Sequence, residues 1–379
     1  MSNAAGPLAR YGGPIDAGWR ARAETTQSAV LPDGRVAISC PAPFGVGGLG
    51  RHLQELAVAV ERRGQQAVCI CEGDSAPDGE CRAPRLTAFG RAMVALTRPL
   101  ADWRMWSVSV GFDSAAARLL PAAEHLISFN GTSLAQFQAA RKARWSSLSL
   151  VSANSHMRRV LRQHARAHRA YPIERPWPTR LLARNLREYA QADRVYVSSR
   201  YVWESFVEEG FPERRLSLFP LTPHPRFTGR GAHPVSTTFD IVYVGGLTVH
   251  KGTPLLVDAI RRLPFADLRL VLVGGWKTRG MRRFLEAASA ADPRIAVQPG
   301  DPLPHLRAAR LCVHPAYEDG FAYAPAEALA CGVPVIVSED TGMKELIRPE
   351  RDGLVLPTGD LVALTEAIGA CYRGELLRD

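Results

Sequence analysis

Hydrophobic residues in the first half of the chain form short apolar runs separated by longer segments with helical periodicity. The runs cover residues 35–40, 67–71, 125–129, 148–152, 194–198 and 216–219. Runs of this length are typical of strands that are buried on both faces of a parallel sheet. Between the first two runs, apolar residues recur on one helical face from Leu53 to Val60, and Gly64 follows. This order predicts a βαβ unit and therefore a right-handed parallel sheet.

The same alternation begins again in the second half of the chain. Apolar runs cover residues 239–244, 268–273, 294–297, 311–313 and 333–337, with helical segments between them. Residues 220–238, between the two series, are rich in Pro, His, Gly, Thr and Arg and lack periodicity, which is typical of an interdomain linker. We therefore predict an α/β protein with two doubly wound, Rossmann-like domains that face each other across a cleft. The predicted ranges are 34–222 for the first domain, 223–238 for the linker and 239–379 for the second domain.

The length and composition of the chain agree with two globular domains. Its 379 residues exceed what one hydrophobic core usually organises, and 46% hydrophobic against 22% charged residues excludes a disordered protein. No apolar run reaches the roughly 18 to 20 residues that span a bilayer. The first 30 residues lack the compact apolar segment of a secretory signal. We expect a cytoplasmic protein with a loose N-terminal extension at residues 1–33.

The formal net charge of +10 is compatible with a nucleic acid, an anionic membrane or an anionic substrate as partner. The densest basic stretch lies between Met157 and Arg187, where Arg158, Arg162 and Arg166 recur on one helical face. No nucleic-acid-binding module is recognisable around it, so we expect no nucleic-acid partner. A solvated arginine face and a peripheral contact with anionic membrane lipid are the two interpretations of this stretch.

The seven cysteines show no metal-ligand spacing, and most lie within strand-like runs. Reduced core thiols are therefore favoured over a zinc site or a disulfide framework. No metal and no cofactor are expected.

A glycine-rich turn follows the first predicted strand. Gly45, Gly47 and Gly50 fit the dinucleotide fingerprint, and Glu72 and Asp74 fall near the distance at which an acid meets a ribose. An NAD(P)-dependent oxidoreductase is therefore an alternative function. Residues 41–44 make the loop longer than the fingerprint requires, because there the first glycine turns the chain directly at the strand end. The other interpretation is that the glycines let the backbone approach a different ligand.

His156 follows the predicted strand at 148–152, at the carboxyl edge where parallel sheets bind ligands. A lone histidine is usually structural, and its position here favours function; the residues alone leave both interpretations open.

Lys251 lies on a glycine-framed turn after the first strand of the second domain. Thr253 is the predicted N-cap and Pro254 a first-turn residue of the helix that follows. A lysine beside a helix N-terminus and backbone donors is suited to an anion such as a phosphate.

Two acids, Asp319 and Glu327, lie eight positions apart between two predicted strands. Pro325 suits the first position of a helix and Gly332 suits a left-handed C-cap, so Glu327 is predicted in the first helical turn. The loop before it is predicted to point free N–H groups at a ligand beyond the strand ends.

The lysine turn and the acid pair together resemble the GT-B glycosyltransferases of family 4, the retaining, nucleotide-sugar-dependent "group 1" type. The resemblance is strongest in the acid-Gly-Phe of residues 319–321 and the Glu-Ala-Leu-Ala-Cys-Gly-Val-Pro-Val-Ile of residues 327–336. It covers residues 36 to about 370 and includes the glycine loop and Ser155-His156. It implies transfer of a hexose-type sugar from a nucleotide diphosphate sugar to a hydroxyl acceptor, a glycan or a lipid-linked sugar, without a metal.

The resemblance also implies roles for individual residues. Glu327 would accept hydrogen bonds from the ribose hydroxyls, Asp319 would bind the donor sugar, and Lys251 would neutralise the diphosphate leaving group. His156 would approach the sugar from the other domain. The remaining donor-site residues are Gly245, Gly246, Glu318, Gly320, Phe321, Ala322 and Gly342, and the N-terminal loop would close through Gly47 and Gly48.

Two positions depart from the family pattern. The first acid is usually Glu and here is Asp319, whose shorter side chain is expected to be offset by Glu318 or by the loop shape. An arginine that usually joins the lysine is replaced by Gly246. Candidates for the missing charge are His250, Arg279 and Arg282. These departures keep open a noncatalytic, sugar-nucleotide-binding protein.

Overall fold

A computed structural model describes residue 15 and residues 18–73, 80–97, 101–175, 179–229 and 238–377. The suggested ribose-binding acid at Asp74 and residues 230–237 of the predicted linker lie outside these ranges. The chain divides into two compact units. Among the described residues, the first unit contains 21–159 and 179–221, and the second contains 15, 18–20, 160–175, 222–229 and 238–377.

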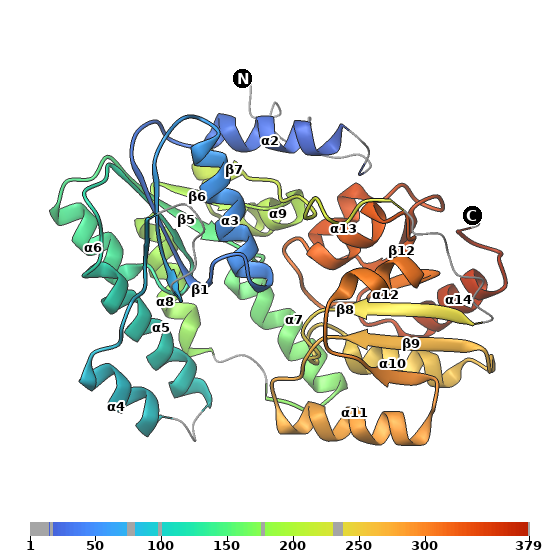
Figure 1. The fold of residues 1–379 in the computed structure, drawn as a ribbon. Helices are drawn as coiled ribbons and strands as arrows, with labels where there is room; N and C mark the ends of the chain where they lie inside the picture. The colour runs from blue at the N-terminus through green and yellow to red at the C-terminus, as the bar shows by residue number, and fades with distance from the viewer. Residues whose placement is uncertain are drawn as a thin grey trace. The chain divides into compact units, whose positions relative to one another are not determined.

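The first unit is built on a seven-stranded parallel sheet with the order β3-β2-β1-β4-β5-β6-β7 (Figure 1). Its strands are β1 (Val36–Pro43), β2 (Ala67–Glu72), β3 (Glu80–Arg82), β4 (His125–Phe129), β5 (Ser147–Ser152), β6 (Arg194–Val197) and β7 (Leu216–Leu218). Its helices are α2 (Trp19–Val30), α3 (Gly47–Glu61), α4 (Ala88–Leu96), α5 (Ala101–Ala117), α6 (Leu134–Lys142), α8 (Arg180–Gln191) and α9 (Arg200–Glu208), with the 3-10 turn η1 (Glu213–Arg215). The strand order reverses between β1 and β4, and the loops after these two strands flank that switch point.

The second unit is built on a six-stranded parallel sheet with the order β10-β9-β8-β11-β12-β13. Its strands are β8 (Phe239–Val244), β9 (Leu268–Val273), β10 (Ile295–Val297), β11 (Leu311–His314), β12 (Val335–Ser338) and β13 (Gly353–Leu356). Its helices are α10 (Thr253–Arg262), α11 (Arg279–Ala291), α12 (Pro302–Ala308), α13 (Tyr323–Ala330) and α14 (Leu361–Tyr372), with η2 (Gly342–Leu346). The order reverses between β8 and β11, so the loops after these strands mark the ligand-binding edge. The two predicted doubly wound sheets are confirmed.

Helix α7 (Met157–Ala170) begins in the first unit and ends in the second. Gln163 Nε2 donates to Asp340 Oδ2 at 2.8 Å, and Tyr171 Oη donates to Asp258 Oδ2 at 3.0 Å. Arg166 Nη2 also donates to the carbonyl oxygen of Thr358 at 2.6 Å. Residues 160–175, which were predicted in the N-terminal domain, are attached to the second unit by these contacts.

Part of the stretch predicted as a loose extension is helical. Helix α2 buries Ala23 and Gln27, each 2% exposed, and Gln27 Nε2 donates to the carbonyl oxygen of Pro220 at 2.7 Å. The buried face of α2 is formed by Trp19, Ala23 and the polar Gln27, so hydrophobic periodicity did not reveal the helix. Among the described residues, no helix combines the length and the apolar character needed to cross a bilayer.

Candidate active site

Lys251 lies in the loop that connects β8 to α10. Gly252 has the left-handed φ of 76° and is the N-cap of α10, so the predicted N-cap at Thr253 is wrong and Thr253 is the first helical residue. A Cβ atom on Gly252 would lie 2.0 Å from the carbonyl oxygen of Pro315. Glycine is therefore required here both for its φ and for the close approach of the chain after β11. Pro254 lies in the first turn, as predicted.

The Lys251 ammonium contacts the acid loop that follows β11. Its Nζ lies 2.7 Å from Asp319 Oδ2 and 3.0 Å from the carbonyl oxygen of Glu318. The Lys251 and Asp319 side chains are 21% and 18% exposed, so this ion pair is largely shielded from water. The predicted lysine and the first predicted acid are therefore brought together.

The Asp319 carboxylate accepts two further hydrogen bonds. His314 Nε2 lies 3.1 Å from Oδ2, and the Ala322 N–H donates to Oδ1 at 3.0 Å. Burial by itself would raise the pKa of Asp319, but the Lys251 ammonium and the His314 hydrogen bond outweigh it and hold the pKa well below its usual range. Asp319 is therefore an ionised acceptor at physiological pH.

The backbone of Asp319 is fixed by the loop after β12. The Asp319 N–H donates to the carbonyl oxygen of Asp340 at 3.1 Å, and the Gly342 N–H donates to the carbonyl oxygen of Asp319 at 2.9 Å. The amide of Gly342, a residue predicted in the donor site, thus holds the acid loop. Gly320, Phe321 and the side chain of Glu318 are buried in the same loop.

Glu327 is buried in α13 and is 2% exposed. The helix begins at Tyr323 after Ala322, which has the left-handed φ of 66° and serves as N-cap. Pro325 is therefore the third helical residue and Glu327 the fifth, so the predicted placement of Glu327 in the first turn is wrong. A proline is still tolerated, since the first four N–H groups of a helix have no intrahelical partner. Gly332 has the predicted left-handed conformation, with φ 76°, and directly follows the C-cap residue Cys331.

The three candidates for the missing positive charge differ in their surroundings. The His250 ring stacks on that of His164 at 4.2 Å, and burial, with His164 and Lys251 nearby, lowers the pKa of His250 well below its usual value. His250 is therefore neutral at physiological pH. Arg279 is exposed, and Arg282 is exposed and pairs with Glu286 at 2.8 Å. Gly246, where the resemblance led us to expect an arginine, is exposed, and space is open around it.

His156 follows β5 in the first unit, as predicted. Its N–H donates to Ser205 Oγ at 2.8 Å, and its buried ring packs against Tyr189 and Phe206 with centroid distances of 4.9 and 5.0 Å. The structure thus gives this side chain an aromatic environment, and its approach to a donor sugar stays a prediction.

The glycine loop of the first unit forms a compact turn into α3. The Gly45 N–H donates to the carbonyl oxygen of Gly50 at 2.9 Å. A Cβ atom on Gly50 would lie 1.9 Å from the carbonyl oxygen of Pro43. Gly47 begins α3 with φ 65°, and Gly47 and Gly48 are exposed. Because β1 continues to Pro43, the loop is shorter than residues 41–44 suggested, and that prediction is wrong. Gly45 is explained by its left-handed φ, and Gly50 by its close approach to Pro43. Gly48 has open space around it, so packing does not require a glycine there.

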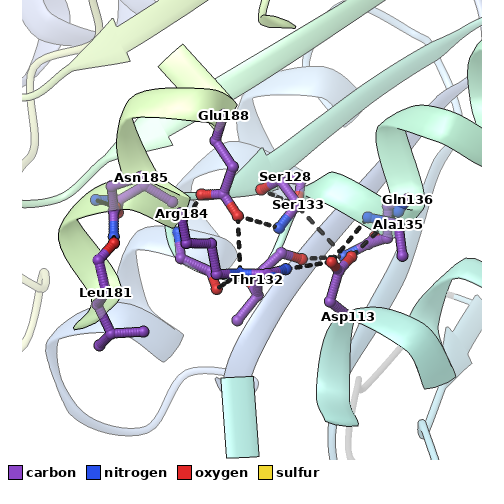
Figure 2. Close-up of polar contacts among 12 residues, drawn as sticks. Asp113, Ser128, Thr132, Ser133, Ala135, Gln136, Leu181, Arg184, Asn185 and Glu188 are labelled. Atoms are coloured by element: carbon purple, nitrogen blue, oxygen red, sulfur yellow. Dashed lines mark hydrogen bonds and ion pairs between the residues drawn. The ribbon is translucent and has the colours of Figure 1, made fainter. Parts of the chain in front are cut away.

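Arg184 was predicted as part of the basic stretch but belongs to a buried network of the first unit. Figure 2 shows Arg184 from α8 reaching Asp113 from α5, and Glu188 from α8 directed toward Ser133. Arg184 pairs with Asp113 and, at 3.2 Å, with Glu188, and its Nε donates to the carbonyl oxygen of Gly131 at 2.6 Å. A buried arginine needs such partners because an unpaired charge in the interior is strongly destabilising.

This network holds the loop between β4 and α6. Glu188, fully buried, accepts from the Gly131 N–H and, at 2.9 Å, from the Ser133 N–H. Asp113 accepts from the Ala135 N–H at 2.8 Å and from that of Gln136 at 3.1 Å, which satisfies the first turn of α6 (Figure 2). The loop after β4 is therefore fixed by charged side chains from two helices.

All seven cysteines are free thiols, and six of them are buried. Within the described ranges, no group of three or more His, Cys, Asp and Glu side chains is arranged to hold a metal ion. A reaction without a metal stays a prediction.

Most of the second unit matches a known family model. Residues 238–373 match the family model described as glycosyl transferases group 1. The D-inositol 3-phosphate glycosyltransferase of Pseudarthrobacter chlorophenolicus is 31% identical over 169 residues, which are 41% of this chain and 40% of that protein. The putative colanic acid biosynthesis glycosyltransferase WcaL of Escherichia coli strain K12 is 27% identical over 177 residues, 42% of this chain and 43% of that protein. The chain thus spans less than half the length of these curated relatives.

Solved structures extend the likeness to both units. Sucrose-phosphate synthase from Thermosynechococcus elongatus has a TM-score of 0.70 at 18% identity, over 89% of this chain and 90% of that one. Anabaena HepE in complex with UDP-glucose has a TM-score of 0.64 at 15% identity, over 90% of both chains. At these identities the likeness shows the fold alone. The chain has the two-domain GT-B fold, and residues 238–373 match the glycosyl transferases group 1 model.

Proposed function

We propose that the protein is a retaining glycosyltransferase of family 4 that transfers a hexose-type sugar from a nucleotide diphosphate sugar to a hydroxyl acceptor. One observation carries this proposal. Lys251 and Asp319 meet at 2.7 Å at the carboxyl edge of the second sheet, within the segment that matches the family. The ammonium is suited to a diphosphate, and Glu327 on α13 is suited to a ribose diol, because a carboxylate only accepts hydrogen bonds.

In this mechanism Lys251 stabilises the negative charge that develops on the leaving diphosphate. A preorganised donor acts in this way because it is already in place when the charge forms. The leaving phosphate itself would take the acceptor proton, so neither a metal nor a carboxylate base is required. The acceptor would be a growing cell-surface polysaccharide or a glycolipid, since the relatives named above include a colanic acid glycosyltransferase.

A panel of nucleotide sugars, scored first by thermal shift and then by transfer, tests this proposal. Lys251→Ala should lower kcat by about 100- to 1,000-fold, the loss expected for one preorganised donor. Glu327→Ala should weaken donor binding, whereas Lys142→Ala, an exposed lysine on α6, should leave both unchanged. Unchanged turnover in Lys251→Ala and Glu327→Ala would contradict the proposal. Donor binding without transfer would instead identify a sugar-nucleotide-binding protein, and a shift with NAD alone an oxidoreductase.

We further propose a cytoplasmic, membrane-peripheral location. Arg158, Arg162 and Arg169 on α7 are exposed and could contact anionic lipid, whereas Arg184 is excluded by its burial. Sedimentation with vesicles that contain anionic lipid, compared with neutral vesicles, tests the idea. Equal binding to both vesicles, or to neither, would count against it.

A further inference from the structure

His314 is the last residue of β11, and its side chain is 5% exposed. Its Nε2 lies 3.1 Å from Asp319 Oδ2, the oxygen that also receives the Lys251 ammonium at 2.7 Å. A carboxylate carries no hydrogen to donate, so Nε2 holds the proton of this bond. An imidazole and an ammonium therefore meet on one carboxylate oxygen.

The His314 ring is itself held by the neighbouring strand. It stacks on Tyr243 with a centroid distance of 5.9 Å and an interplanar angle of 10°. Tyr243 is fully buried on β8, and its hydroxyl donates to the carbonyl oxygen of Gly246 at 2.9 Å. Because β8 pairs with β11, a continuous set of contacts joins the lysine loop to the acid loop through Tyr243 and His314.

We propose that His314 is a positioning residue for the transfer reaction, which fixes the Asp319 carboxylate beside Lys251. The side chain of aspartate is one methylene shorter than that of glutamate, so its carboxylate reaches less far from the backbone. The Ala322 N–H fixes one oxygen, and His314 and Lys251 fix the other. With His314 removed, Oδ2 would be held by the Lys251 ammonium alone, and the carboxylate would lose one of its two fixed partners on that oxygen.

This inference rests on the proposed function, and paired substitutions at one position test it. His314→Leu removes the N–H with little change in size, and His314→Gln retains an N–H donor of similar reach. His314→Leu should lower kcat/KM for the nucleotide sugar by about 10- to 100-fold, the loss typical of a hydrogen bond to a charged group, with the acceptor KM unchanged. His314→Gln should recover most of this loss. Leu311→Met, a volume-conserving change on the same strand, is the control for general effects on β11.

A second measurement does not depend on turnover. The pKa of Asp319, followed by ¹³C NMR of its carboxyl carbon, should rise in His314→Leu and stay low in His314→Gln, because the His314 hydrogen bond helps to lower it. A purely structural role for His314 would not produce this pattern.

The outcomes separate the two proposals. If the unmodified protein transfers sugar from no donor of the panel, the proposed function fails, and the NMR titration still decides whether His314 positions Asp319. If His314→Leu matches the unmodified protein in donor kcat/KM and in the pKa of Asp319, the inference about His314 is wrong. It is also wrong if His314→Gln is as impaired as His314→Leu.

Discussion

Asp319 has most of its hydrogen-bonding capacity filled by the protein itself. A carboxylate has about four lone-pair sites, and Lys251, His314 and the Ala322 N–H use three of them. The remaining site is on Oδ1, which matches a single sugar hydroxyl. The proposed donor-sugar role and the ion pair with Lys251 are therefore compatible on one side chain.

Gly246 offers a direct test of the missing arginine. Its φ lies outside the left-handed region, and open space surrounds the position that a Cβ atom would take. Gly246→Arg should therefore leave the unfolding temperature unchanged. An added guanidinium near the diphosphate should lower the donor KM about tenfold, the effect of one further charge-assisted hydrogen bond.

The control for this change is Ala290→Arg. Ala290 lies near the end of α11 and is exposed. Arginine at this position adds the same charge outside the loop that carries Gly246 and Lys251. Steady-state kinetics at varied donor concentration compares the two variants. An unchanged donor KM in Gly246→Arg, or an equal decrease in Ala290→Arg, would contradict the prediction.

At the scale of elements, the central strands were predictable because parallel strands buried on both faces leave continuous apolar runs. The edge strands β3 and β13 were not predicted: Glu80–Arg82 has a polar pattern, and Gly353–Leu356 is only partly buried. The helix starts at Gly252 and Ala322 were misplaced by one or two residues. Each depends on a left-handed residue, and nothing in the propensity of Ala322 signals its φ.

The candidate site was predictable to a similar degree. Lys251, Asp319 and Glu327 were found by their spacing relative to strands and helix starts. His314 was missed, although its position at the end of β11, before the acid loop, was a usable signal. Its role depends on the distance between two side chains, which spacing along the chain does not determine. The buried pairing of Arg184 was hidden for the same reason, because the helix α8 that carries it also carries exposed arginines.

The network that joins α5 and α8 makes the stability of the protein depend on pH. Burial raises the pKa of Glu188 to about 7, against the opposing effects of Arg184 and the two backbone amides, with Asp113 adding to the increase. A raised pKa in the folded state means that the folded protein holds a proton which the unfolded chain releases above its ordinary pKa. The stabilising contribution is therefore complete below about pH 4.5 and is lost as the pH rises through about 7.

Urea unfolding at pH 5, 6, 7 and 8 measures this contribution against the variant Glu188→Gln, which cannot titrate. The difference in free energy of unfolding between the two proteins should change by about 3 kcal/mol across this range, in favour of the variant at high pH. Glu204→Gln, an exposed acid on α9, should follow the unmodified protein. A pH dependence that is the same in Glu188→Gln and the unmodified protein would show that Glu188 does not titrate in this range.

At the scale of the whole molecule, the two units do not correspond to two continuous pieces of chain. Residues 160–175 leave the first unit, pack on the second, and lead back to α8 in the first. Hydrophobic patterning divides a chain into consecutive segments, so it could not predict that residues 160–175 belong to the second unit. Its last part reaches the lysine loop: Glu174 accepts from the Val249 N–H at 2.8 Å and from the Thr278 hydroxyl.

This contact predicts that Glu174 supports the loop that carries Lys251. Val249 is fully buried two residues before Lys251, so Glu174→Ala would leave its N–H without this acceptor, at a cost of about 1–3 kcal/mol in the free energy of unfolding. The Val249 amide should then exchange its hydrogen faster, and donor binding should weaken while acceptor binding does not. Hydrogen exchange read by NMR, together with thermal unfolding, measures both effects, with Glu204→Ala as the exposed control. If exchange at Val249 is unchanged, residues 160–175 connect the two units without stabilising the loop that carries Lys251.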